Sequence, residues 1–291
     1  EMGIHPAMLS ALTVLGASGG GVSPLAATGI IGINLCAEFG LTGIEEKFLM
    51  NGVLSSTVYA VVVYFLLGGY KLHLDETVVP EKTPPFNRKQ EITLLGIVAM
   101  VFLVMILHIN VGLVGFGVAA VLSFLKVSDE AEALKRIPWG TLLLITGVGV
   151  LMHQIIDQGG IKMLSAALVS VMNERTATSI MGICSGIMSW FSSTSGVVMP
   201  TLIPTIPHIV AQLGGGVDPL ELATAITMIS NTAGISPLST GGALALAAYS
   251  SAAGASYEEQ HHLFVKMFMI SALGVTVLSI CAYFGLYHWL L

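Results

Sequence analysis

Long apolar runs separated by short polar loops dominate the chain. Three of these runs, 92–125, 176–217 and 222–257, contain no Asp, Glu, Lys or Arg. About 20 apolar residues suffice to cross roughly 30 Å of hydrocarbon, so several of the runs are long enough to hold more than one crossing. The pattern therefore predicts an all-α polytopic membrane protein.

Polar residues and helix breakers divide the runs into individual elements. The first element is interrupted by a glycine- and proline-rich segment, 19–24, and two closely linked spans turn at residues 108–110. As one helix those two spans would be about 50 Å long, too long for one crossing. The predicted membrane elements are 6–36, 48–70, 92–107, 111–125, 139–156, 176–213, 219–253 and 263–290.

The amino-acid composition also indicates that much of the chain is surrounded by lipid. Of the 291 residues, 54% are hydrophobic and 10% are charged, whereas soluble domains carry about 25% charged residues. The net charge of −6 says little about partners, because the ionisable residues lie in short loops on two sides of a membrane. The three cysteines lie in apolar surroundings and are interpreted as small hydrophobic residues.

Two polar loops carry the clearest clusters of Lys and Arg, 71–91 and 126–138. Two predicted spans separate them, so they share one side of the membrane, and excess Lys and Arg makes that side cytoplasmic. The first element then crosses from inside to outside, and 219–253 crosses from outside to inside. The C-terminus is expected outside.

The opening stretch recurs after 213 residues without a gap. Because the two copies cross in opposite directions, they form an inverted-topology repeat. The matched residues are Gly3, Pro6, Leu9, Gly21, Ser23, Pro24, Leu25 and Gly29 with Gly216, Pro219, Leu222, Gly234, Ser236, Pro237, Leu238 and Gly242. The predicted parts are 1–70 (C-terminal part of repeat 1, a broken helix plus one span), 71–91 (cytoplasmic loop), 92–138 (helix pair and cytoplasmic loop) and 139–291 (repeat 2, with hairpin 176–213 and broken helix 219–253).

Inverted repeats with discontinuous helices are typical of secondary transporters, whose binding sites lie at the breaks. Gly and Pro end a helix and leave carbonyls and N–H groups that hydrocarbon cannot satisfy, but a bound substrate or ion can. A proline kink used only for packing is the alternative. The candidate binding residues are Ser18, Gly19, Gly21, Ser23 and Pro24 in the first copy, and Ser230, Asn231, Thr232, Gly234, Ser236 and Pro237 in the second.

The stretch 176–213 has a hydroxyl-rich centre between two short apolar flanks. We interpret it as a re-entrant hairpin that enters from the outside and meets the second break; two full spans joined by a polar loop are the alternative. Its tip supplies the further candidates Ser192, Ser193, Thr194 and Ser195. Na⁺ is a hard cation that prefers oxygen ligands, and the proposed Na⁺ ligands are Ser193, Thr194, Asn231 and Thr232.

Three stretches resemble the ion transporter superfamily: "WGTLLLITGVGVLMHQIIDQGGI" (139–161), the hairpin with its Ser-Ser-Thr tip, and "ISNTAGISPLSTGG" (229–242). Within it they are most similar to the divalent anion:sodium symporters and the MatC-type dicarboxylate carriers. This resemblance implies a homodimer, elevator-type alternating access, and carboxylates held between two hairpin tips and two broken helices. It also implies that a first hairpin precedes residue 1, so the chain corresponds to the C-terminal two-thirds of such a carrier.

One departure from that family concerns the coupling ion. The symporters have Ser-Asn-Thr at each hairpin tip, whereas the tip here is Ser-Ser-Thr and the true Ser-Asn-Thr, 230–232, lies at the broken helix. Coupling to Na⁺ is favoured over coupling to H⁺, but the identity of the ion is open at this stage.

The sequence thus predicts a cation-coupled secondary transporter of small carboxylates, such as malonate or succinate, in a bacterial inner membrane. It predicts no cofactor beyond the coupling Na⁺ or H⁺ and no nucleic-acid partner. A Na⁺/H⁺ or inorganic-anion transporter of the same superfamily is an alternative, although no carboxylate lies mid-span. The membrane subunit of a binding-protein-dependent uptake system is another. An enzyme is disfavoured, since HExxH, GxSxG and paired intramembrane aspartates are missing from the sequence.

Overall fold

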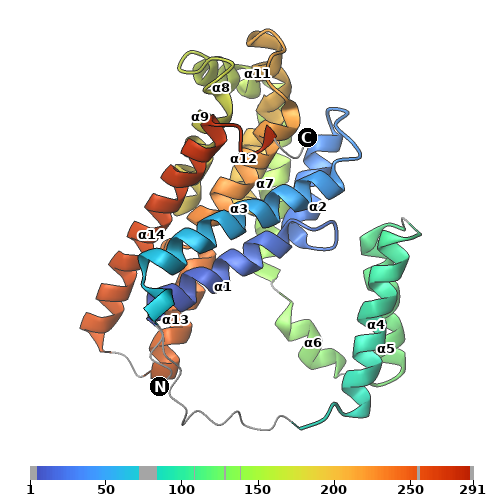
Figure 1. Cartoon of the computed structure of the whole chain (residues 1–291). Coiled ribbons are helices and arrows are strands. Elements are labelled where there is room, and N and C mark those ends of the chain that lie inside the picture. The colour runs from blue at the N-terminus through green and yellow to red at the C-terminus, as the bar shows by residue number, and fades with distance from the viewer. Residues whose placement is uncertain are drawn as a thin grey trace. The chain divides into compact units, whose positions relative to one another are not determined.

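The computed structural model describes residues 5–71, 84–107, 109–127, 129–137, 139–253 and 256–288, and within these ranges the chain forms helices and turns without a β-strand (Figure 1). Gly3 of the predicted repeat, most of the predicted loop 71–91 and the last three residues lie outside these ranges. The chain divides into two compact units, Glu1–Leu74 with Leu144–Leu291, and Asp75–Leu143.

Several helices have the length and apolar character of membrane spans. In the described part, the helix Glu45–Leu66, the run Thr194–Gln212 and the helix Tyr257–Tyr283 are each long and apolar enough to cross a membrane. Large apolar side chains such as Phe65 and Met269 are more than half exposed, as expected of surfaces that face lipid. The prediction of an all-α polytopic membrane protein is confirmed.

The smaller unit is built from a pair of apolar helices. Asn87 begins α4 with a capping box, in which Asn87 and Gln90 exchange side-chain-to-backbone hydrogen bonds of 2.9 Å. Asn110 caps α5 by accepting from the amides of Gly112 and Leu113. Helix α5 therefore begins directly after the turn expected at 108–110. His108 lies outside the described residues. The helices are α4 (Arg88–Met105), α5 (Val111–Phe124) and α6 (Glu130–Arg136).

The larger unit contains the two stretches that the sequence predicts to be repeated. The boundary between the units falls within α7. The elements are α1 (Pro6–Gly21), α2 (Ala27–Ala37), α3 (Glu45–Leu66), η1 (Gly69–Lys71), α7 (Trp139–Asp157), α8 (Gly160–Val169), α9 (Ala177–Trp190), η2 (Thr194–Val198), α10 (Met199–Leu202), η3 (Ile203–Thr205), α11 (Ile206–Gln212), α12 (Pro219–Ala233), α13 (Thr240–Ala253) and α14 (Tyr257–Tyr283).

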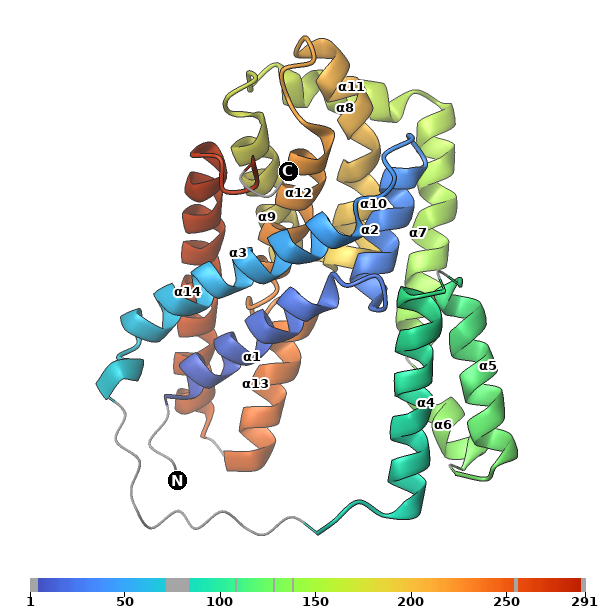
Figure 2. The ribbon, with the colours of Figure 1, turned by 45° about the vertical axis from the view of Figure 1, so that its right-hand side comes forward.

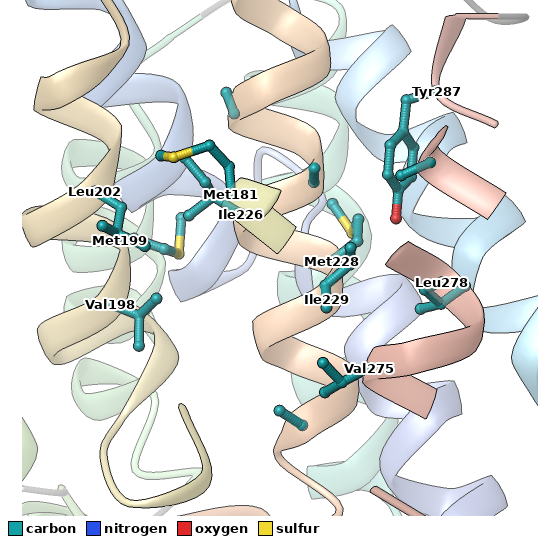
Figure 3. Close-up of a cluster of buried hydrophobic side chains, with 14 of the residues drawn as sticks. Met181, Val198, Met199, Leu202, Ile226, Met228, Ile229, Val275, Leu278 and Tyr287 are labelled. Carbon is teal, nitrogen blue, oxygen red and sulfur yellow. The ribbon is translucent and has the colours of Figure 1, made fainter. Parts of the chain in front are cut away.

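Helix α12 forms the centre of this unit and is buried on all sides over most of its length. Helices α9, α14 and α3 pack around it. Glycines on α9 permit the close approach, because a Cβ at Gly182 would lie 2.2 Å from Cδ1 of Ile229, and one at Gly186 would lie 2.6 Å from Cγ1 of Val275. In Figure 3, hairpin side chains such as Met199 lie on one side of α12 and α14 side chains on the other. The hairpin is therefore anchored to the second broken helix.

The two broken helices run in opposite directions. In both views the chain rises through α1 and α2 and descends through α12 and α13 (Figures 1 and 2). The N-terminal caps also correspond, since the side chains of His5 and Asp218 each accept from the amide two residues later, and a proline follows each cap. Opposite chain direction is what an inverted repeat requires.

Candidate functional site

Both helix breaks are centred on their prolines and begin later than the sequence predicts. Helix α1 continues through Gly21 and α2 starts at Ala27, while α12 ends at Ala233 and α13 starts at Thr240. The expected breaks, 19–24 and 231–237, placed the ends of α1 and α12 too early. The reason is that proline ends a helix through its missing N–H and its clash with the preceding turn, whereas glycine only weakens it. Ser18, Gly19 and Gly21 of the first copy, and Ser230, Asn231 and Thr232 of the second, therefore occupy the last turns of α1 and α12.

The two breaks share a pair of backbone hydrogen bonds at the offset of 213 residues. In the first, the amides of Ser23 and Ala26 each donate to the carbonyl three residues earlier, at 3.1 and 3.0 Å. In the second, the amides of Ser236 and Ser239 do the same, at 2.9 Å each. Both breaks thus contain equivalent turns, and the second has one further bond, from the amide of Gly242 to the carbonyl of Gly234 at 2.9 Å.

A matched glycine closes each break. A Cβ at Gly29 would lie 2.0 Å from the carbonyl oxygen of Ser23, and a Cβ at Gly242 would lie 2.2 Å from that of Ser236. No side chain fits at either position unless the backbone moves. These glycines explain why the motif Ser-Pro-Leu is followed by Gly at the same distance in both copies.

The second half-helix of each break begins with free backbone donors. Helix α2 has no side-chain cap, and the amides of Ala27, Thr28 and Gly29 have no acceptor in the part of the chain that the structure covers. The amides of Thr240 and Gly241 at the start of α13 likewise have no acceptor among the described residues. Unpaired N–H groups and the positive end of the helix dipole favour a bound anion.

The two broken helices meet across α3. A Cβ at Gly52 would lie 2.2 Å from Cγ2 of Val22, in the first break, and 3.3 Å from Sδ of Met228 on α12. Gly19, predicted to bind substrate, is buried against Ser56 of α3. Gly19 and Ser56 both line a pocket between α1 and α3, together with Gly16, Gly20 and Thr57.

The hairpin tip contains a short π-helical turn, η2, in which the amide of Val198 donates to the carbonyl of Ser193 at 3.1 Å, and this turn lies beside both α12 and α2. Ser193 caps it by accepting from the amide of Gly196 at 3.1 Å, while the hydroxyl of Ser192 donates to the carbonyl of Met188 at 2.6 Å. On the second arm, Met199 Cε would lie 2.9 Å from a Cβ at Gly32 of α2. The structure thus places the tip against the second half-helix of the first repeat.

A serine that the sequence analysis missed links the tip to α12. The hydroxyl of Ser189 lies 2.7 Å from the carbonyl oxygen of Ser230 and 2.9 Å from Oγ1 of Thr194. A hydroxyl has one proton, and a carbonyl can only accept, so the proton of Ser189 is donated to Ser230. Thr194 must then be the donor in the second bond, which leaves only lone pairs of Thr194 facing outward.

The direction of each hydrogen bond likewise shows whether another hydroxyl still has a proton to donate to a ligand. Thr232 donates to the carbonyl of Met228 at 3.0 Å, so its proton is already used; the side chain is buried, with its Cγ2 toward Gly274 of α14. Ser193 and Ser236 instead accept from backbone amides, and each retains a proton to donate. Lone pairs suit a cation and free protons suit an anion, and a hydroxyl has two lone pairs and one proton. Ser193, a predicted cation ligand, and Ser236 therefore each keep one lone pair as well as the proton.

Some candidate side chains are unpaired in the described part of the chain. The half-buried side chains of Ser18, Ser23, Ser195 and Asn231 make no hydrogen bond there. Gly234, Ser236 and Pro237 lie in the second break, as Ser23 and Pro24 do in the first. Asn231 is therefore free to offer a ligand either its amide protons or its carbonyl oxygen.

A cation at this site would have to use neutral oxygen ligands. Within the described ranges no three His, Cys, Asp or Glu side chains gather into a metal site. The segments 189–199 and 226–243, which form the tip and the second break, contain no Asp, Glu or His. Hydroxyls, the amide of Asn231 and backbone carbonyls are the oxygen donors that the arrangement offers.

Comparison with known proteins identifies one family. The sequence profile of the citrate transporter family (CitMHS) matches residues 1–229. No curated protein and no solved structure matches the chain. The matched segment includes the first break, the hairpin and most of α12.

Proposed function

The chain belongs to the citrate transporter family, and from this premise we propose that it carries citrate or a smaller carboxylate such as malonate or succinate, driven by a sodium gradient. Membership identifies a transporter family of the carboxylate type; the particular anion and the coupling ion belong to the proposal. The finer resemblance to divalent anion:sodium symporters and MatC-type carriers is part of the same proposal.

The observation that carries the proposal is the pair of matched breaks, each opening into a half-helix with free amides. A carboxylate between them would accept from the amides at Ala27 and Thr240 and from the hydroxyl protons of Ser193 and Ser236. Such donors hold an anion without a buried Lys or Arg. Ser23 in the first break, Ser195 at the tip and Ser18 in the last turns of α1 add unpaired hydroxyls in the described part of the chain.

The cation is assigned to the oxygens that have no proton left to donate. Thr194 and Thr232 already use their protons within the protein, and the unpaired amide of Asn231 adds a third oxygen. Because the tip and the second break lack a titratable side chain, Na⁺ fits this site better than a proton does. A cation bound there would offset the charge of the carboxylate.

The experiment is uptake of radiolabelled citrate, malonate and succinate by the full-length protein in proteoliposomes, with and without an inward Na⁺ gradient. Uptake that requires the gradient supports the proposal. Uptake driven only by a pH gradient would replace Na⁺ with H⁺. Absence of uptake for all three acids by folded protein would favour an inorganic anion or a system that needs a binding protein.

Single alanine substitutions test the site. Ser193→Ala, Asn231→Ala and Ser236→Ala are each expected to lower carboxylate uptake by about tenfold, since each removes one hydrogen bond or ion contact to a charged ligand. The matched control is Ser170→Ala, because Ser170 is exposed and donates within its own turn to Ala167. Equal losses at all four positions would remove the support for the site.

The remaining features of the proposal concern assembly and topology. We propose a homodimer in a bacterial inner membrane, with the C-terminus outside and the hairpin 176–213 entering from that side. Helix α9 has 14 residues, about 21 Å at 1.5 Å per residue, which is short for a full crossing.

A further inference from the structure

The C-terminal end of α9 holds the carbonyl end of α12 through two hydrogen-bonded links. In the first, Ser189 donates to the carbonyl of Ser230 at 2.7 Å. In the second, Nε1 of Trp190 donates to Oγ of Ser271 at 3.0 Å, and Ser271 donates to the carbonyl of Ala233 at 2.9 Å. Both carbonyls belong to the last turn of α12, directly before the second break.

Only the first link reaches the hairpin tip. Ser189 is fully buried, and its oxygen accepts the proton of Thr194 at 2.9 Å. Without this acceptor the hydroxyl of Thr194 would be free to rotate, and its proton could point toward the space that the proposed cation occupies. A proton in that direction repels a cation, whereas a lone pair attracts it.

We propose that Ser189 is a positioning residue for the coupling cation: it orients the hydroxyl of Thr194 and fixes the tip against the last turn of α12. This inference rests on the proposed cation-coupled transport. Ser189 itself does not contact the cation, and its effect passes through Thr194. The role requires the hydroxyl, since only a group that donates to Ser230 and accepts from Thr194 makes both bonds.

The test compares Ser189→Ala with Ser189→Thr and with Ser185→Ala in the full-length protein. Ser185 lies one turn earlier on α9, is also fully buried, and donates only within its own helix, to Gly182 at 2.8 Å. Uptake of radiolabelled citrate into proteoliposomes is measured against external Na⁺ concentration, and then against citrate concentration at saturating Na⁺.

Ser189→Ala is expected to raise the half-saturating Na⁺ concentration by about five- to tenfold, as the loss of one hydrogen bond predicts, and to change the KM for citrate by less than about twofold. Ser189→Thr is expected to restore Na⁺ dependence, and Ser185→Ala to leave it unchanged. A general structural defect would change both constants together. If Ser189→Ala does not fold, Ser189→Cys replaces it: a thiol is only a weak donor and acceptor, so this variant should raise the half-saturating Na⁺ concentration in the same direction, again with the KM for citrate changed by less than about twofold.

The outcomes separate the inference from the proposed function. If the unmodified protein takes up citrate with Na⁺ dependence and Ser189→Ala behaves like it, the positioning role is wrong while the proposed function stands. If Ser189→Ala and Ser185→Ala shift Na⁺ dependence equally, the effect is one of packing and the role is again wrong. Uptake by the unmodified protein without any Na⁺ dependence overturns the coupling and this inference with it.

Discussion

Gly242→Ala is expected to lower carboxylate uptake by at least about tenfold, and Gly29→Ala to do the same. The added methyl group would lie 2.2 Å from the carbonyl oxygen of Ser236 in the second break and 2.0 Å from that of Ser23 in the first. Backbone atoms cannot move aside as a flexible side chain can, so the break must change shape and the free amides that follow it must move. Overpacking of this kind costs about 1–3 kcal/mol, and a displaced site should lose at least about tenfold in uptake.

Gly16→Ala is the matched control for both glycine variants. Gly16 also lies in a broken helix, but nothing is within 4 Å of its added methyl group, and alanine is the better helix former by roughly 1 kcal/mol. Uptake by Gly16→Ala should equal that of the unmodified protein. Normal uptake by Gly29→Ala or Gly242→Ala, in protein that reaches the membrane in normal amount, would show that the break geometry is not required for transport.

Asn51→Leu is expected to raise the stability of the protein. Asn51 lies on α3 next to the contact between Gly52 and Met228 of α12, is fully buried, and neither atom of its amide has a hydrogen-bond partner within the described structure. A desolvated, unpaired amide costs about 1–3 kcal/mol, and leucine of similar volume removes that cost. The measurement is the unfolding midpoint of the purified protein in detergent.

The control for this variant is Asn34→Leu, since Asn34 is exposed on α2 and surface substitutions change stability by less than about 0.5 kcal/mol. A lower midpoint for Asn51→Leu, or a loss of citrate uptake with the midpoint unchanged, would mean that the amide is paired in the working protein. A bound water or ion would then be its partner.

The breaks illustrate how far the sequence can be interpreted. Proline and glycine have local effects on the backbone, so two matched Ser-Pro-Leu segments predicted two equivalent breaks, and the structure has equivalent turns at both. The residues at which the breaks begin were predicted less accurately, because the sequence does not say whether Gly19 or Gly21 still fits within a helix. In the folded chain, Gly19 lies against Ser56 of α3, and α1 continues as a helix through Gly21.

The candidate ligands illustrate the opposite case. The sequence placed hydroxyl side chains at the tip and at the second break, and the structure brings these two groups together. It could not identify Ser189, because the partner that gives Ser189 its importance is a backbone carbonyl 41 residues away. Nor could it distinguish Ser193 from Thr194, since the two hydroxyls differ only in which neighbour accepts or donates.

The sequence by itself determined that the chain lies in lipid, that it is helical, that it has two helix breaks and that the two copies are paired. Each of these depends on local chemistry: the length of an apolar run, the missing N–H of proline, or the missing Cβ of glycine. Only the tertiary structure decided which hydroxyls have a proton left to donate and which have only lone pairs. That distinction depends on contacts between α9, α12 and the hairpin tip, and such contacts exist only once the helices have packed.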